Sequence, residues 1–331
     1  MKKVYAITGA GGFLGNTLVR KLVASGCEVR ALTLPGDPCP SLQGVECQRY
    51  DGDVTQPDTL NGFLETGPQE ELVVIHCAAI VYIKNKPNPQ VFRVNVDGTA
   101  NIIQKCLKKH AKLIYVNTVH TLPEPEDDSV IVETDHFSQE AVVGLYAKSK
   151  AKAAQLVLDA VRDQGLRAVI IQPSGIIGPG DFGATHMTGL ILAATRGRLP
   201  AIVKGGYDFV DVRDVAEGIL SAIDKGRDGE CYILSNRYVT IKEMVDLACG
   251  YAGAKKIRVT LPLWVAKCVA PLCELYSTLK KQVPLFTRYS LYTLQAKSHF
   301  SHEKADRELG YTTRPLEETI SDTVEWLSHM K

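Results

Sequence analysis

A tyrosine and a lysine stand four residues apart in the run GLYAKSK, as Tyr146 and Lys150. The apolar pattern from about 140 to 164 predicts a helix, so the two side chains should lie one turn apart. A phenol has a pKa of about 10, and an ammonium group close by can lower it until the phenol serves as an acid/base near neutral pH. A tyrosine packed on an apolar stripe beside a solvated lysine would give the same spacing, so the pair alone does not establish catalysis.

Thr118 supplies a hydroxyl that could complete such a site. It follows the run KLIYVN (112–117), which predicts a buried strand. Ligands of open parallel sheets bind outside the carboxyl ends of the strands. Thr118 could therefore hydrogen-bond a carbonyl or alkoxide oxygen of a substrate.

Three glycines near the N-terminus predict a dinucleotide cofactor. Gly9, Gly12 and Gly15 follow a predicted strand and open a predicted helix. Gly9 permits a tight turn, Gly12 lets the backbone approach a pyrophosphate, and Gly15 lets the helix pack closely with the phosphate at its N-terminus. The second strand ends near Thr33 without a carboxylate, and Leu34 follows it. This favours NADP over NAD, although no guanidinium stands there to bind a 2′-phosphate.

The elements that must position these residues alternate between strand and helix. Buried strands are predicted at 4–8, 28–33, 72–78, 112–117 and 168–173, and helices at 13–25, 89–110 and 140–164. This order predicts an α/β fold, a Rossmann-type doubly wound parallel sheet. Glycine and proline become frequent after Pro173, so a smaller C-terminal substrate lobe is expected. We predict a dinucleotide-binding domain at 1–173, to which 205–235 returns, and a substrate lobe from 174–204 and 236–331.

Composition limits the partners. The chain has 331 residues and a formal charge of +1, which gives no electrostatic footprint for nucleic acid. Nine cysteines without metal-binding or disulfide spacing indicate reduced thiols and a cytoplasmic protein. The longest apolar region, from Val259, is interrupted by charges and prolines, so no membrane span is expected. The partner should be a small molecule.

Several motifs together resemble the extended short-chain dehydrogenase/reductase family, which includes the NAD-dependent epimerases and dehydratases. They are the glycine loop, HCAA after the third long strand, NVDGT at 95–99, Thr118, YxxxK at 146, QPSGIIGPGD at 172 and FVDVRDVAEGI. The similarity covers nearly the whole chain. Within the family, it is greatest to the dihydroflavonol 4-reductase-like and 3β-hydroxysteroid dehydrogenase-like branch.

This resemblance implies a role for each site residue. Tyr146 would be the acid/base, Lys150 would lower its pKa and hold the nicotinamide ribose, and Thr118 would steady the substrate oxygen. The implied cofactor contacts are Gly9, Gly12, Phe13, Leu14 and Gly15 at the pyrophosphate, Asp53 and Val54 at the adenine, Ala78 and Ala79 on the adenosine side, and Pro173 and Ile176 beside the nicotinamide. Asn95 would support the site or tie down its own helix.

Two departures from the epimerase pattern favour simple hydride transfer to a ketone or aldehyde. Gly175 stands where nucleotide-sugar enzymes of the family carry an asparagine, and Val119 and His120 replace the acidic residues that dehydratases place after the catalytic hydroxyl. Pro123 replaces an asparagine of plant dihydroflavonol reductases, which argues against a flavonoid. A nucleotide-sugar epimerase/dehydratase and a non-catalytic NADP-binding protein remain the alternatives.

The smaller lobe carries apolar and aromatic residues that could cover a hydrophobic or aromatic substrate or could simply form core. They are Trp264, Leu272, Tyr276, Phe286 and Tyr292. The helices at 89–110 and 140–164 could also pair in a homodimer.

Overall fold

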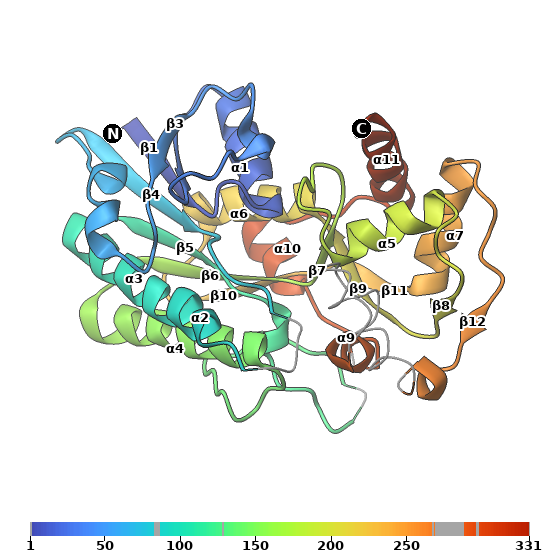
Figure 1. Cartoon of the computed structure of the whole chain (residues 1–331). Coiled ribbons are helices and arrows are strands. Elements are labelled where there is room, and N and C mark those ends of the chain that lie inside the picture. Colours follow the sequence, from blue (N-terminus) through green and yellow to red (C-terminus); the bar gives the residue numbers. More distant parts are fainter. Residues whose placement is uncertain are drawn as a thin grey trace.

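The computed structural model describes residues 2–82, 87–127, 129–266, 268, 288–295 and 298–330. Its largest element is a seven-stranded parallel sheet, in the order β10-β6-β5-β4-β1-β2-β3 (Figure 1). The strands are β1 (Lys2–Thr8), β2 (Glu28–Thr33), β3 (Gln48–Asp51), β4 (Glu70–His76), β5 (Lys112–Val116), β6 (Ala168–Pro173) and β10 (Cys231–Leu234). This confirms the predicted doubly wound fold. The direction of winding changes between β1 and β4, where such sheets bind ligands.

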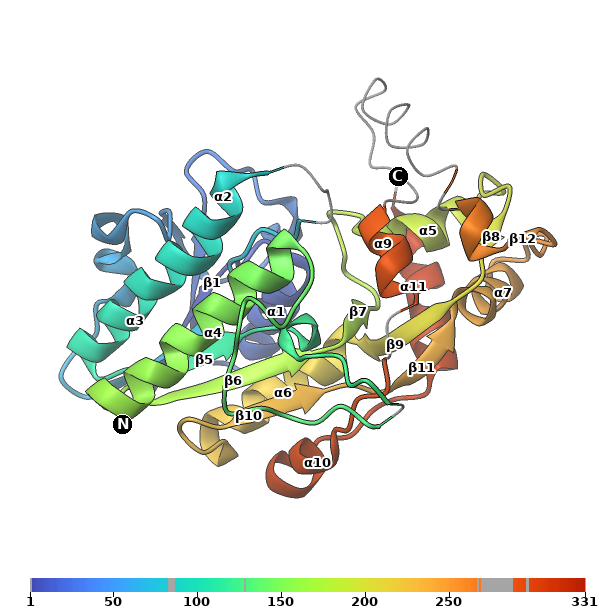
Figure 2. The same ribbon diagram turned by 90° about the horizontal axis from the view of Figure 1, so that it is seen from below.

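Helices cover both faces of the sheet (Figures 1 and 2). One face packs on α1 (Phe13–Ala24) and α6 (Val212–Lys225), and the other on α3 (Gly98–Lys109) and α4 (Leu145–Gln164). The short α2 (Pro89–Phe92) runs into α3 through a π-helical turn, Arg93–Asp97. Side chains alternate between two cores along each strand, so both faces are apolar, as the continuous apolar runs predicted.

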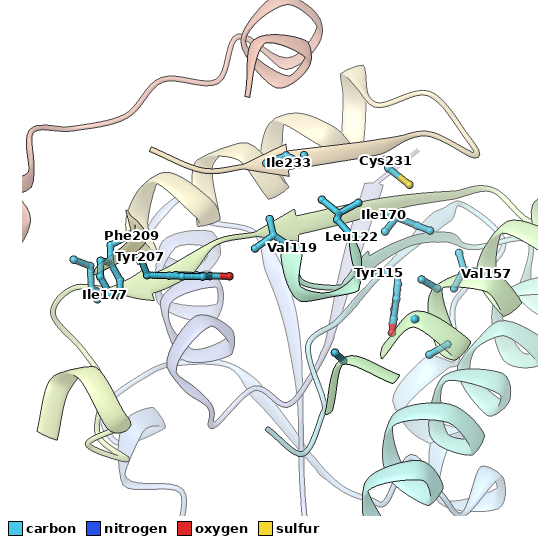
Figure 3. Close-up of a cluster of buried hydrophobic side chains, with 14 of the residues drawn as sticks. Tyr115, Val119, Leu122, Val157, Ile170, Ile177, Tyr207, Phe209, Cys231 and Ile233 are labelled. Carbon is cyan, nitrogen blue, oxygen red and sulfur yellow. The ribbon is translucent and has the colours of Figure 1, made fainter. Parts of the chain in front are cut away.

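The C-terminal part adds two small sheets and the remaining helices. One sheet has the order β11-β9-β7, and the other pairs β12 with β8. These elements are β7 (Gly175–Ile177), β8 (Ile202–Val203), β9 (Gly206–Asp211), β11 (Arg237–Thr240), β12 (Thr260–Leu261), α5 (His186–Thr195), α7 (Ile241–Tyr251), α9 (Arg288–Thr293), α10 (Glu303–Leu309) and α11 (Leu316–His329). A single core cluster runs from Tyr115 under the main sheet to Tyr207 and Phe209 in the small one (Figure 3).

Some boundaries differ from those predicted. Strand β3 was missed because QRYD is polar and mostly exposed at the sheet edge. Helix α4 begins at Leu145 rather than near 140, because Gly144 before it has φ of +96°, outside the helical region. From 205–235, α6 and β10 lie on the main sheet whereas β9 lies in the small one. The predicted domain boundaries stay a prediction.

Candidate active site

The glycine loop is closed by backbone contacts that exclude larger residues. Gly9 has φ of +64°, and a Cβ there would lie 2.7 Å from the backbone nitrogen of Ala78. A Cβ on Gly15 would lie 2.1 Å from the carbonyl oxygen of Gly9. Gly15 therefore lets the first turn of α1 pack directly against the glycine loop. Gly12 is the N-cap of α1, so the first free N–H groups of that helix follow it.

A groove of about 290 Å³ opens at the carboxyl ends of β1, β2, β3 and β4. Its lining includes six of the predicted cofactor residues: Gly9, Gly12, Asp53, Val54, Ala78 and Ala79. Phe13 and Leu14 form the first turn of α1, and the Leu14 side chain packs into the core, so only their backbone faces the loop's anion-binding end. The groove fits the adenosine and pyrophosphate of a dinucleotide.

Asp37 is a lining residue that the sequence interpretation missed. It lies in the turn after β2, beside Thr33 and Leu34, and its carboxylate accepts the backbone N–H of Cys39 at 2.9 Å. No lysine or arginine is among the described residues that line this groove. The available signal was the acidic residue in LPGD, which lies too far past the strand end to match the usual spacing.

Helix α4 brings the predicted catalytic residues to the end of β5. The Lys150 ammonium is 3% exposed and donates to the carbonyl oxygen of Val116 at 2.6 Å. Thr118 stands two residues further on, and α4 contacts the turn Val119–Thr121 that Thr118 caps. Tyr146 lies one helical turn before Lys150. The lysine is therefore buried against β5, the strand that Thr118 follows, and is not a solvated surface residue.

The environment of Lys150 favours the uncharged form of its amine. Burial lowers the pKa of Lys150 to about 7, against a smaller opposing effect of Cys77. The ammonium and neutral forms are therefore close in free energy near physiological pH.

Asn95 ties the catalytic helix to the edge of the groove. Its Oδ1 accepts the N–H of Ile80 at 2.7 Å, and its Nδ2 donates to the Ile80 carbonyl at 3.1 Å and to Ser149 Oγ at 2.9 Å. The Ser149 hydroxyl in turn donates to the carbonyl oxygen of Tyr146 at 2.7 Å. No local sequence pattern indicates this role of Ser149, because its partner Asn95 lies 54 positions away in the chain.

His76 extends this network to the glycine loop. Its ring nitrogens lie 2.6 Å from Thr8 Oγ1 and 3.1 Å from Thr99 Oγ1. Thr99 donates its one hydroxyl proton to the Asn95 carbonyl at 2.7 Å, so it must accept from Nε2–H, and Thr8 donates to Nδ1. Thr8 then accepts the N–H of Ala78 at 3.2 Å. Every donor is satisfied with a neutral ring, and burial accordingly lowers the pKa of His76 to about 3.

Pro173 and Ile176 lie at the junction of the two sheets. Pro173 ends β6 and is buried, and Ile176 lies in β7 and is partly buried. Neither lines the groove, so their predicted place beside the nicotinamide stays a prediction.

A second, narrower cavity of about 100 Å³ lies beyond Thr118. Its lining includes Val119, His120, Leu122, Ile131, Val142, Tyr207, Tyr292 and Phe300. His120 stacks on Tyr207 with ring centroids 5.4 Å apart, and burial lowers the pKa of His120 to about 4. The carboxylate of Glu124 also lines this cavity, so this end of the site combines apolar side chains with polar groups, among them a neutral imidazole.

The apolar and aromatic residues expected to cover a substrate lie in different environments. Tyr292 lines the narrow cavity and donates to Glu124 at 2.6 Å, whereas Trp264 is 71% exposed. Leu272, Tyr276 and Phe286 lie outside the described residues.

Other features bear on partners. In the described part of the chain, no group of three potential metal-binding side chains is found, and no helix is long and apolar enough to cross a membrane. The eight described cysteines are free thiols.

Comparison with known proteins gives the family. The chain is 29% identical over 335 residues to "Putative dihydroflavonol 4-reductase" of Synechocystis, covering 99% of this chain and 96% of that protein. It is 29% identical over 331 residues to "Sterol demethylase protein B" of Methylococcus capsulatus, covering 97% of each. The crystal structure of gox2253 superposes with a TM-score of 0.82 at 32% identity, covering 98% of each chain. The model of the NAD dependent epimerase/dehydratase family matches residues 5–235. With this match and the extended short-chain dehydrogenase/reductase fold, the chain belongs to the NAD dependent epimerase/dehydratase family.

Proposed function

We propose that this enzyme transfers a hydride between a nicotinamide cofactor and a ketone, aldehyde or alcohol, with Tyr146 as acid/base. The observation that carries this is the burial of Lys150, whose Nζ donates to the Val116 carbonyl oxygen at 2.6 Å. Lys150 lies one helical turn from Tyr146, and Val116 lies two residues before Thr118. An isolated tyrosine on a helix edge would need no buried ammonium beside it. The buried lysine therefore supports the proposed triad, because a nearby ammonium suits proton transfer by a phenol.

The chain's own residues would handle the proton and the substrate oxygen. The bound nicotinamide supplies or accepts the hydride. Thr118 Oγ1 accepts the N–H of His120 at 3.3 Å, which leaves its hydroxyl proton to be donated to the substrate oxygen. Tyr146 gives that oxygen a proton in reduction and takes it back in oxidation. The positive charge of Lys150 stabilises the phenolate form of Tyr146.

The narrow cavity supports a hydrophobic substrate. Most of its lining side chains are aliphatic or aromatic, which favours an apolar substrate body, and Glu124 and His120 offer polar partners for a substrate hydroxyl or carbonyl group. The named relatives include a dihydroflavonol reductase and a sterol demethylase protein, which agrees with an apolar substrate body.

For the cofactor, Asp37 reverses the preference for NADP expected from Thr33 and Leu34. A carboxylate at the adenosine end repels a 2′-phosphate and can accept a bond from a ribose hydroxyl, and no lining cation offsets it among the residues described there. We therefore propose NAD. Asp37→Ser should raise NADPH affinity relative to NADH at least severalfold, measured by fluorescence titration, and an unchanged ratio would contradict this assignment.

Tyr146→Phe tests the acid/base role. It should leave NADH affinity within about twofold and lower turnover by at least 100-fold, the usual size of an acid/base contribution. Tyr251→Phe, at a 48% exposed tyrosine, is the matched control and should keep wild-type turnover. Screening carbonyl compounds by loss of nicotinamide absorbance supplies the substrate. Full activity of Tyr146→Phe would refute the mechanism.

The alternative of a nucleotide-sugar epimerase is disfavoured by packing at Gly175. A Cβ there would lie 2.8 Å from the Phe209 ring and 2.9 Å from the Asp208 carbonyl, so the asparagine typical of those enzymes has no room. Binding of a UDP- or dTDP-sugar would restore this alternative. Tight cofactor binding without turnover on any carbonyl would instead favour the non-catalytic alternative. The homodimer through the α3 and α4 region stays a prediction.

A further inference from the structure

Lys150 is buried, and no salt bridge joins it to a carboxylate among the described residues. The titratable side chains described near it are His76 at the end of β4, Cys77 directly after that strand, Tyr115 on β5, and Tyr146 one turn away on its own helix. The hydrogen-bond pattern keeps His76 neutral, and burial raises the pKa of Cys77 to about 12, so it remains a thiol. Burial alone would therefore drive Lys150 toward its uncharged form.

The Tyr115 ring faces this ammonium. Lys150 Nζ lies 4.2 Å from the ring centroid, well inside the range of a cation–π interaction. Tyr115 is 0% exposed and projects from β5 into the layer of α3 and α4 (Figure 3). Its hydroxyl has no hydrogen bond of acceptable geometry among the described residues, although Thr99 lies nearby. Burial raises the pKa of Tyr115, so the ring stays uncharged.

A neutral ring suits this position better than a carboxylate would. A carboxylate would hold the proton on Lys150, but its negative charge would also act on Tyr146 and oppose formation of the phenolate. The quadrupole of an aromatic face attracts the ammonium at short range and adds no net charge to the site. The positive charge of Lys150 thus remains available to Tyr146.

We propose that Tyr115 is a positioning residue whose ring face holds the Lys150 ammonium in place and in its charged form. This inference deepens the proposed function and rests on it for the role of the charge, whereas the protonation of Lys150 can be measured without turnover. The ring and not the hydroxyl is the active part, because the Lys150 ammonium lies over the ring face.

The direct test is the titration of Lys150 by NMR in protein labelled with ¹⁵N at lysine Nζ, with the signal assigned by its absence from Lys150→Met. In Tyr115→Leu the midpoint should fall by about one pH unit relative to the wild type, the size of a desolvated cation–π contact. Tyr115→Phe should restore the wild-type midpoint. A trifluorinated phenylalanine at 115 keeps the ring's shape but weakens its negative face, so the Lys150 midpoint should fall as it does in Tyr115→Leu. This variant separates loss of the cation–π contact from any disturbance of the core by leucine.

Turnover provides the second readout. For alcohol oxidation, the acidic limb of the pH profile should move to higher pH in Tyr115→Leu and in the trifluorinated protein, because Tyr146 loses its stabilising charge. Equal Lys150 midpoints in the phenylalanine and trifluorinated proteins would overturn the inference. The Lys150 midpoint could shift as expected in Tyr115→Leu while the wild-type protein reduces no carbonyl compound. That result would leave the inference standing and overturn the proposed function instead.

Discussion

Ser149→Ala should destabilise the protein through one specific contact, the bond from Asn95 Nδ2 to Ser149 Oγ at 2.9 Å. Ser149 is 0% exposed, so water cannot replace the lost acceptor. Leaving a buried N–H of Asn95 unsatisfied costs about 1–3 kcal/mol, and the better helix propensity of alanine returns about 0.5. The net loss should be about 0.5–2.5 kcal/mol.

Ser328→Ala is the matched control. Both serines lie in helices and donate to the carbonyl three residues earlier, Ser149 to Tyr146 at 2.7 Å and Ser328 to Glu325 at 2.6 Å. Ser328 is exposed and has no counterpart of Asn95, so its replacement should be neutral or slightly stabilising. The comparison therefore isolates the contact between α4 and Asn95.

Differential scanning calorimetry and steady-state kinetics measure the two consequences. Tm should fall by about 1–4 °C in Ser149→Ala and should not fall in Ser328→Ala. Turnover should also fall in Ser149→Ala, by roughly tenfold, because the turn carrying Tyr146 loses its tie to the groove. Equal shifts in the two variants would refute the assignment of the network as a positioning device.

The remaining predictions concern the glycine loop and pH. Gly15→Ala should abolish cofactor binding in a titration of NADH fluorescence, because its Cβ would overlap the Gly9 carbonyl at 2.1 Å, whereas Gly250→Ala, with nothing within 4 Å, should bind normally. Stability should fall on acidification: His76 and His120 have folded-state pKa values of about 3 and about 4, below their unfolded value, so the unfolded chain binds protons first as pH drops below about 6.5. Each histidine adds a slope of about 1.4 kcal/mol per pH unit between these limits, and melting at pH 5, 6 and 7 should show a smaller slope in His120→Gln than in wild type.

Local patterns were sufficient for much of the fold. Apolar runs located the central strands because parallel strands are buried on both faces, and the strand-loop-helix context predicted around Gly9 and Gly15 is present in the structure. The same logic failed for β3, whose polar residues lie at the sheet edge, and for the start of α4, where a single glycine with positive φ delays the helix.

Some features of the candidate site could likewise be predicted from the sequence, and others could not. The four-residue spacing of Tyr146 and Lys150 follows from helix geometry and can be read from the sequence. That the lysine is buried against Val116 cannot, because this depends on how α4 packs on β5, 34 residues away in the chain.

The sequence by itself determined a Rossmann-type fold, a dinucleotide loop and a candidate Thr118, Tyr146 and Lys150 triad, because each is encoded by neighbouring residues or by a strand end. Only the tertiary structure brought Asp37 into the groove, joined Ser149 to Asn95 and placed the Tyr115 ring against Lys150. These contacts join separate elements, and their distances depend on the packing of helices against the sheet. Spacing along the chain therefore leaves them undetermined.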